Sequence, residues 1–206
     1  FRVGEGAKVA LIGANGSGKT TLIRMISGDL QPEGGTISIS GGLGVMRQFI
    51  GSVRDESTVR DLLISVAPKR IRDAATAVQV SEELMNTRNE ERDQMAYAQA
   101  LVDWGDADGY DFEVIWDVCC TEALGKSFDQ VSHRAVNTLS GGEQKKLVLR
   151  ALLQGPEEVL LLDEPTTGLD PRARIEFWQF LRKIQKQEGT TVIFTTHLFE
   201  EACISH

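Results

Sequence analysis

The chain has 206 residues, of which 41% are hydrophobic and 25% charged, and its formal net charge is −8. This length fits one domain with room for an inserted lobe, and the acidic balance lacks the basic footprint of a domain that grips nucleic acid. No apolar run approaches the roughly 20 residues that cross a bilayer, and the opening residues lack the apolar stretch of a signal peptide. The three cysteines have no metal-ligand spacing, so we expect a cytoplasmic domain with reduced thiols.

Short apolar runs and glycine-rich turns open the chain. Residues 9–12 form an apolar run that ends at a glycine-rich loop, and residues 20–26 then read as a helix. The period-two alternation of residues 36–40 between glycine pairs predicts a strand. A second apolar stretch at 43–46 precedes Gln48.

A helical pattern follows from about residue 59 to 103. A short helix should end near Pro68, and residues 74–103 contain neither proline nor glycine. Tyr97, Leu101 and Trp104 fall on one face of that helical stretch, which favours core packing over a ligand platform. Residues 103–117 carry six acidic residues and no basic one, and we expect a solvated acidic loop there rather than a carboxylate metal site.

Helices and strands alternate again in the C-terminal third. The expected order is a helix to about Leu153, a strand at 159–162, a helix at 172–187 and a strand at 191–194. Such alternation predicts an α/β fold with a mostly parallel sheet. The predicted organisation is an α/β core of residues 1–50 and 138–206, with a helical subdomain inserted at 51–137.

The most specific motif is a glycine-rich loop between the first strand and the first helix. It reads Gly13-Ala14-Asn15-Gly16-Ser17-Gly18-Lys19-Thr20 and is followed by Thr21. This pattern is a P-loop, in which backbone N–H groups and the helix N-terminus surround a phosphate. Lys19 would reach the β- and γ-phosphates of ATP, and the Thr20 hydroxyl would ligate Mg²⁺.

Two carboxylates end the apolar strand at 159–162. Asp163 would emerge at the carboxyl edge of the sheet, where it can hold Mg²⁺, and Glu164 can orient or deprotonate the attacking water. Gln48 can ligate Mg²⁺ and the same water while it tethers the helical subdomain. His197 follows the last strand and would sense the γ-phosphate through a hydrogen bond.

A second glycine-containing motif, Ser140-Gly141-Gly142-Glu143-Gln144 after Leu139, opens a helix. Ser140 and Glu143 have the spacing of a capping box, so ordinary capping is one interpretation. The tandem glycines leave bare N–H groups beside the helix dipole, which suits a phosphate. We expect this motif to contact the γ-phosphate of ATP held by a partner subunit, and Asp170 to lie at the dimer seam.

Taken together, these blocks resemble the nucleotide-binding domain of the ATP-binding cassette superfamily. The resemblance implies a P-loop fold in which two cassettes, on one chain or in a homodimer, close head to tail over two ATP–Mg²⁺ and hydrolyse them. Lys19, Thr20, Gln48, Asp163, Glu164 and His197 would then serve one site, and residues 140–142 the opposite one. The resemblance also implies a cassette shortened at both ends, with the adenine-stacking aromatic outside it.

Different segments of the chain resemble different subfamilies of this superfamily. Residues 97–104, 109–113 and 124–125 look like the first cassette of the ABC-F subfamily, whose soluble proteins often act on ribosomes in translation or antibiotic resistance. Thr167-Gly168 and residues 196–202 instead look like exporter cassettes. The main expectation is therefore a ribosome-associated ABC-F-like ATPase. The alternatives are the ATPase subunit of a membrane transporter and a nucleotide-gated binding module without turnover.

Overall fold

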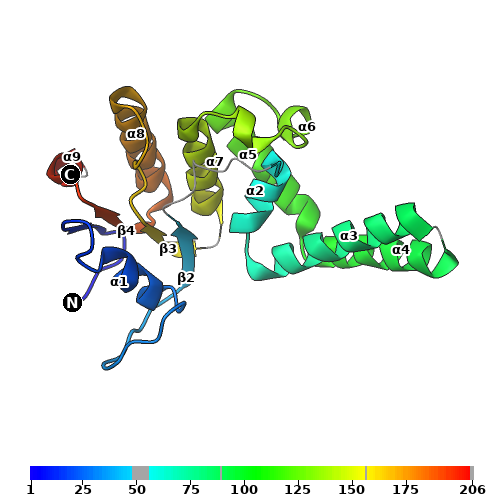
Figure 1. Cartoon of the computed structure of the whole chain (residues 1–206), viewed down its shortest axis with the longest axis horizontal. Coiled ribbons are helices and arrows are strands. Elements are labelled where there is room, and N and C mark those ends of the chain that lie inside the picture. Colours follow the sequence, from blue (N-terminus) through cyan, green and yellow to red (C-terminus); the bar gives the residue numbers. More distant parts are fainter. Residues whose placement is uncertain (48–55, 89, 156, 205–206) are drawn as a thin grey trace.

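A parallel sheet organises the computed structural model, which describes residues 1–47, 56–88, 90–155 and 157–204. Its strands, within this part of the chain, are β1 (Lys8–Ile12), β2 (Gly42–Met46), β3 (Glu157–Leu162) and β4 (Thr191–Thr196). They pair in the order β1-β4-β3-β2 and are all parallel. Parallel neighbours require crossover connections, and helices supply them (Figure 1). The predicted α/β fold is confirmed.

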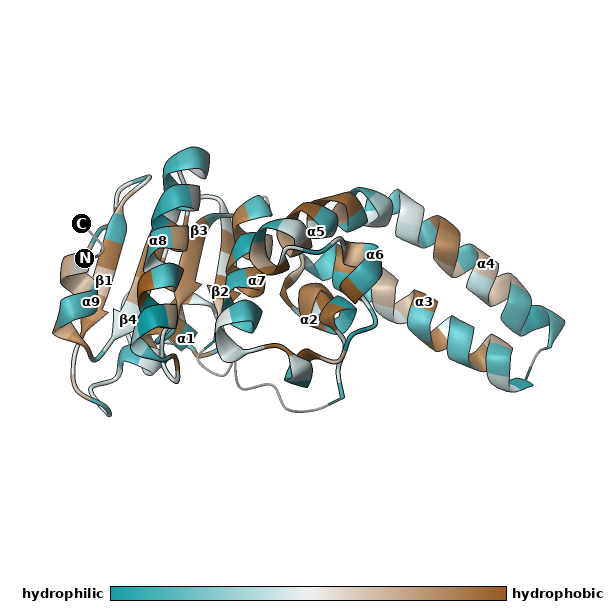
Figure 2. Ribbon diagram, turned by 90° about the horizontal axis from the view of Figure 1, so that it is seen from above, coloured by the Kyte–Doolittle hydropathy of each residue, from teal (hydrophilic) through white to brown (hydrophobic). Residues whose placement is uncertain are grey.

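Helices cover both faces of this sheet (Figure 2). Helix α1 (Lys19–Ile26) places Ile23 against Leu161 and Ile193 in a small cluster. Helices α7 (Gly141–Gln154) and α8 (Pro171–Glu188) pack on the strand residues that point the other way, as in the contact of Trp178 with Phe194, whose ring centroids lie 4.8 Å apart. Since side chains alternate along a strand, β3 and β4 contribute to both layers.

The larger core continues from the sheet into a helical lobe formed by α2 (Val59–Val66), α5 (Gly109–Leu124) and α6 (Phe128–Val131). Trp116 is 1% exposed, and its ring centroid lies 6.3, 6.2 and 5.6 Å from those of Trp104, Phe112 and Phe128. Gly109 is part of this packing, because a Cβ atom there would lie 2.1 Å from the Trp104 ring. The lobe is thus held by tightly packed aromatic side chains.

Helices α3 (Lys69–Arg88) and α4 (Glu91–Asp106) run side by side and project from the rest of the molecule as a hairpin (Figure 1). The base of the hairpin enters the aromatic core through Trp104. Two short elements complete the described chain, a 3₁₀ turn at Val136–Thr138 before α7 and α9 (Phe199–Ile204) after β4. Within the described ranges, none of the helices has the length and apolarity needed to cross a membrane.

Two predictions about local structure are wrong. Residues 36–40 are exposed and form no strand, because no strand of the described chain pairs with them and alternation alone supplies no hydrogen-bonding partner. Residues 103–117 are not a loop, since the end of α4 and the first half of α5 occupy them. All of the acidic residues there except Asp108, the N-cap of α5, lie within these helices, and the described residues contain no group of three or more His, Cys, Asp or Glu side chains placed to hold a metal ion.

Candidate active site

The P-loop connects β1 to α1 and shapes a hollow lined by Asn15, Gly16, Gly18, Lys19, Thr20, Thr21 and Glu164. Gly16 and Gly18 have φ values of 82° and 89°, a left-handed conformation that L side chains disfavour. Gly18 is also the N-cap of α1, and no side chain caps that helix. The first N–H groups of α1 are therefore available to an anion, and the helix dipole favours one.

Lys19 extends across the loop toward the sheet. Its Nζ donates hydrogen bonds to the carbonyl oxygens of Gly13 at 2.8 Å and Ala14 at 3.1 Å. The same Nζ lies 3.5 Å from Glu164 Oε1. The ammonium group thus lies between the phosphate-binding loop and the Glu164 carboxylate. In this position it can contact a terminal phosphate and that carboxylate at the same time.

Asp163 and Glu164 follow β3 at the carboxyl edge of the sheet. Asp163 Oδ1 accepts hydrogen bonds from Thr20 Oγ1 at 3.2 Å and from Thr195 Oγ1 at 2.6 Å. The Thr195 hydroxyl in turn accepts from the Glu164 backbone N–H at 2.8 Å. Because Thr195 is fully buried on β4, this single hydroxyl fixes both acidic residues to the neighbouring strand.

The Glu164 carboxylate faces a second group of side chains. Its Oε2 accepts a hydrogen bond from Thr167 Oγ1 at 3.1 Å and lies 3.6 Å from His197 Nδ1. Glu164 has a φ of 44°, which is uncommon for a residue with a side chain. Such strained residues concentrate at functional sites, since the surrounding fold must hold them in place.

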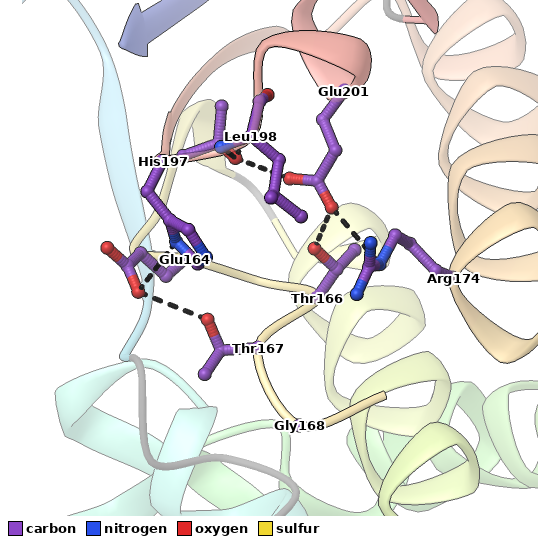
Figure 3. Close-up of a pocket in the computed structure, with 9 residues that line it drawn as sticks. Glu164, Thr166, Thr167, Gly168, Arg174, His197, Leu198 and Glu201 are labelled. Atoms are coloured by element: carbon purple, nitrogen blue, oxygen red, sulfur yellow. Dashed lines mark hydrogen bonds and ion pairs between the residues drawn. The ribbon is translucent and has the colours of Figure 1, made fainter. Parts of the chain in front are cut away.

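His197 leaves the end of β4 and turns toward Glu164, at the edge of a pocket shown in Figure 3. The pocket lies between the residues after β3 and those after β4. It is lined by Glu164, Thr166, Thr167, Gly168, Arg174, Thr196, His197, Leu198 and Glu201. The structure therefore brings together Lys19, Thr20, Asp163, Glu164 and His197, as their positions at strand ends predict.

The second glycine motif forms the N-terminus of α7. Ser140 Oγ accepts from the Glu143 N–H at 3.2 Å, and Glu143 Oε2 accepts from the Ser140 N–H at 2.7 Å, so the predicted capping box is present. Burial, the largest single influence, raises the pKa of the Glu143 carboxyl. The hydrogen bonds with Ser140, together with the charges of Arg134 and Lys146, outweigh burial and leave the pKa lowered. Gln144 points inward instead, and its Nε2 donates to the Val136 carbonyl at 3.0 Å.

Two further predicted positions lie apart from this centre or outside the described residues. Asp170 is the N-cap of α8, and its Oδ1 accepts from the N–H groups of Arg172 and Ala173, each at 3.0 Å. These backbone hydrogen bonds, led by that of Ala173, lower the pKa of the Asp170 carboxyl. Gln48, expected to bind Mg²⁺ and the attacking water, lies outside the residues that the structure describes.

Sequence reasoning missed four residues around Glu164, namely Lys145, Thr166, Thr195 and Glu201. Thr195 carried a weak signal, because its hydroxyl interrupts the apolar end of a buried strand, whereas Thr166 lies four residues beyond the end of β3 and has no such signal. Lys145 and Glu201 carried none, since each reads as an ordinary charged residue on the surface of a helix. Both are instead 2% exposed.

Comparison with known proteins agrees with this geometry. Residues 1–167 match the family model described as "ABC transporter", so the chain belongs to that family. It is an ATPase domain of the ATP-binding cassette class. A solved structure of a metal-chelate type ABC transporter in an inward-facing conformation superposes with a TM-score of 0.68 at 22% identity, covering 99% of this chain and 68% of the other. That likeness supports the fold.

Two relatives match nearly the whole length of this chain. The chain is 54% identical over 197 residues to an "Antibiotic resistance protein" of Mycobacteroides abscessus, covering 96% of this chain and 35% of the relative. It is 32% identical over 202 residues to the "Daunorubicin/doxorubicin resistance ATP-binding protein DrrA" of Streptomyces peucetius, covering 98% of this chain and 53% of the relative. The chain thus spans about a third to a half of the length of these two relatives.

Proposed function

We propose that this domain binds ATP on the P-loop and hydrolyses it at Glu164. The observation that carries the proposal is the position of the Glu164 carboxylate beside the P-loop hollow, where its oxygens lie 3.5 Å from Lys19 Nζ and 3.6 Å from His197 Nδ1. Residues 13–21 hold the phosphates through backbone N–H groups, and Lys19 neutralises the charge that develops on the γ-phosphate. Positioning and electrostatics of this kind supply most of the catalysis in phosphoryl transfer.

The residues beside the P-loop suit Mg²⁺. This hard cation prefers oxygen ligands and retains several waters, and the Thr20 hydroxyl and the Asp163 carboxylate lie 3.2 Å apart on adjacent elements. When bound with ATP, Mg²⁺ would offset the negative charge of the phosphates. Thr195 holds the Asp163 carboxylate in place through a 2.6 Å hydrogen bond. Gln48 is proposed as a further ligand.

Glu164 orients and deprotonates the attacking water. One carboxylate oxygen faces Lys19, and the other accepts from Thr167 Oγ1. These contacts restrict rotation of the carboxylate, which keeps an oxygen directed at the hollow where the γ-phosphate would lie. His197 is placed to donate to the γ-phosphate and to hold Glu164 at the same time.

The arrangement fits a head-to-tail pair of cassettes. Ser140, Gly141 and Gly142 present the N-terminus of α7, and we assign them to the γ-phosphate of ATP on a partner cassette, with Glu143 and Gln144 supporting that turn. Asp170 is exposed as the N-cap of α8, and we assign it to the seam between the two cassettes. The α/β core then comprises residues 1–50 and 138–206, and residues 51–137 form the inserted helical subdomain.

The whole protein, in this proposal, is an export system for a drug-like compound. DrrA of Streptomyces peucetius is named as a drug-resistance ATP-binding protein, and a Nod factor export ATP-binding protein of Rhizobium etli is 34% identical over 215 residues. The exporter-like residues 196–202 agree with this assignment. The domain would work at the cytoplasmic face of a membrane, against a transmembrane partner subunit, with the helical lobe as the docking side.

A second candidate is a ribosome-associated ABC-F-like resistance factor. One observation favours it: the matched segment is 35% of the Mycobacteroides abscessus resistance protein, which leaves room for a second cassette of this size on the same chain. The projecting hairpin of α3 and α4 would then contact the ribosome (Figure 1). The ABC-F resemblance of residues 97–104 supports the same candidate.

One experiment tests the ATPase assignment, and a second separates the two candidates. In the full-length protein, Lys19→Ala should abolish ATP turnover, whereas an unchanged rate would refute the P-loop assignment. Glu164→Gln should retain ATP binding and stall hydrolysis, which traps the closed pair of cassettes. Fractionation of cells that express this stalled variant, in ATP and Mg²⁺, then places the protein. Recovery with membranes supports the export system, and co-sedimentation with ribosomes in a sucrose gradient supports the second candidate.

A further inference from the structure

A buried carboxylate joins the two loops that flank Glu164. Glu201, on α9, is 2% exposed, and its two oxygens accept hydrogen bonds from Thr166 Oγ1 and from Thr196 Oγ1, the latter at 2.5 Å (Figure 3). Thr166 lies two residues after Glu164, and Thr196 directly precedes His197. Arg174 Nε lies 3.5 Å from the same carboxylate. Burying an ionised carboxylate is costly, so these partners must compensate it.

A buried ammonium group also contacts the loop that follows Glu164. Lys145, on α7, is also 2% exposed, and its Nζ donates a 2.6 Å hydrogen bond to the carbonyl oxygen of Thr167. Burial lowers the pKa of Lys145 to about 8, and the negative charge of Glu201 acts in the opposite direction. The Thr167 side chain then donates to Glu164 Oε2 at 3.1 Å.

We infer that Lys145 and Glu201 are positioning residues for ATP hydrolysis, which hold the Thr166–Thr167 segment and thereby aim Glu164 and His197. The inference rests on the proposed function of Glu164. Neither residue touches the hollow at the P-loop, so both act through the threonines. Because Lys145 lies on the helix that begins with the Ser140–Gln144 motif, a shift of α7 would be passed to the carboxylate of the same cassette.

The inference predicts a specific kinetic pattern. An error of about 1 Å in a reacting group can reduce the rate roughly a hundredfold without a comparable loss of binding. Lys145→Met and Glu201→Gln should each lower kcat about tenfold to a hundredfold, while the Kd for ATP stays within about threefold of the wild-type value. The double variant should lose less than the product of the single losses, since both residues act on one segment.

The test uses the full-length protein and expresses turnover per bound nucleotide, which removes any effect of misfolded molecules. Lys146→Met is a matched control, because Lys146 is the next residue on α7 and its Nζ bonds Glu176 Oε2 at 2.8 Å, away from both loops. Glu200→Gln is the control on α9, where Glu200 is exposed. Both controls should retain the wild-type kcat.

Three outcomes would overturn the inference: a wild-type kcat in Lys145→Met and Glu201→Gln, a loss that disappears when turnover is counted per bound nucleotide, or losses that multiply independently in the double variant. Glu164→Gln is measured in the same series. Full activity of that variant would remove the proposed function, whereas an inactive Glu164→Gln beside fully active Lys145 and Glu201 variants would remove this inference alone.

Discussion

The hydroxyl of Thr195 offers a sharp test of how the sheet holds the two acidic residues. Thr195→Val keeps the branched shape that suits a buried strand and removes only the polar atom. The change deletes the acceptor of the Glu164 N–H, at 2.8 Å, and the donor to the Asp163 carboxylate, at 2.6 Å. Thr195 is fully buried, so bulk water does not replace either bond. From about 1–3 kcal/mol for a buried polar group that loses its partner, the two losses together should lower the free energy of unfolding by about 2–4 kcal/mol.

Urea unfolding of the full-length protein, followed by tryptophan fluorescence, measures this loss, and the ATPase assay should show a reduced kcat because both carboxylates become less constrained. Thr191→Val is the matched control. Thr191 lies at the opposite end of the same strand and accepts a 2.8 Å hydrogen bond from the Gly6 N–H, so it should lose stability while kcat is retained. A Thr195→Val protein within about 0.5 kcal/mol of wild type, with normal kcat, would refute the reasoning, since that is the range of neutral surface substitutions.

Three other predictions concern packing and ionisation. Gly109→Ala should destabilise the protein by about 1–3 kcal/mol in urea unfolding, because its Cβ would lie 2.1 Å from the Trp104 ring, whereas Gly4→Ala, with open space around it, should not. Burial raises the pKa of Cys119 and of Cys120 to about 12, so peptide mass spectrometry after native alkylation should find label on the exposed Cys203 and on the other two only in denaturant. Burial lowers the pKa of Lys145 to about 8 from 10.5, so the unfolded chain binds more protons than the folded chain between these pH values. The free energy of unfolding of the wild type should therefore increase relative to that of Lys145→Met as the pH rises from 8 to 10. A difference in unfolding free energy that does not change with pH would contradict the lowered pKa.

Much of the fold could be predicted from local patterns, for identifiable reasons. The strands β3 and β4 contain the continuous apolar runs 159–162 and 192–194, and the P-loop fixes the order strand, loop, helix around Lys19. The strand expected at 36–40 failed because pairing is a long-range property that alternation does not encode. The acidic stretch at 103–117 was misread as a loop because a high density of acidic residues does not distinguish a loop from a solvated helix face. Gly109 lies in α5, where its missing side chain makes room for Trp104.

The candidate site likewise contains residues that the sequence predicts and residues that it does not. Asp163, Glu164 and His197 could be placed because strand ends of a parallel sheet converge, which is a rule of topology. Lys145 and Glu201 could not, since their burial depends on how α7 and α9 pack around the loops. A charged residue on a helix is ordinarily solvated, and only the packed structure shows that these two are not.

The hairpin of α3 and α4 changes what a small movement at the nucleotide can accomplish. Twenty residues of α3 extend about 30 Å at 1.5 Å per residue, and the hairpin joins the body only at its base. A tilt of the hairpin by about 10° at the aromatic core would therefore move its tip by roughly 5 Å, given that length. A partner that contacts the hairpin near its tip would be displaced by about that distance.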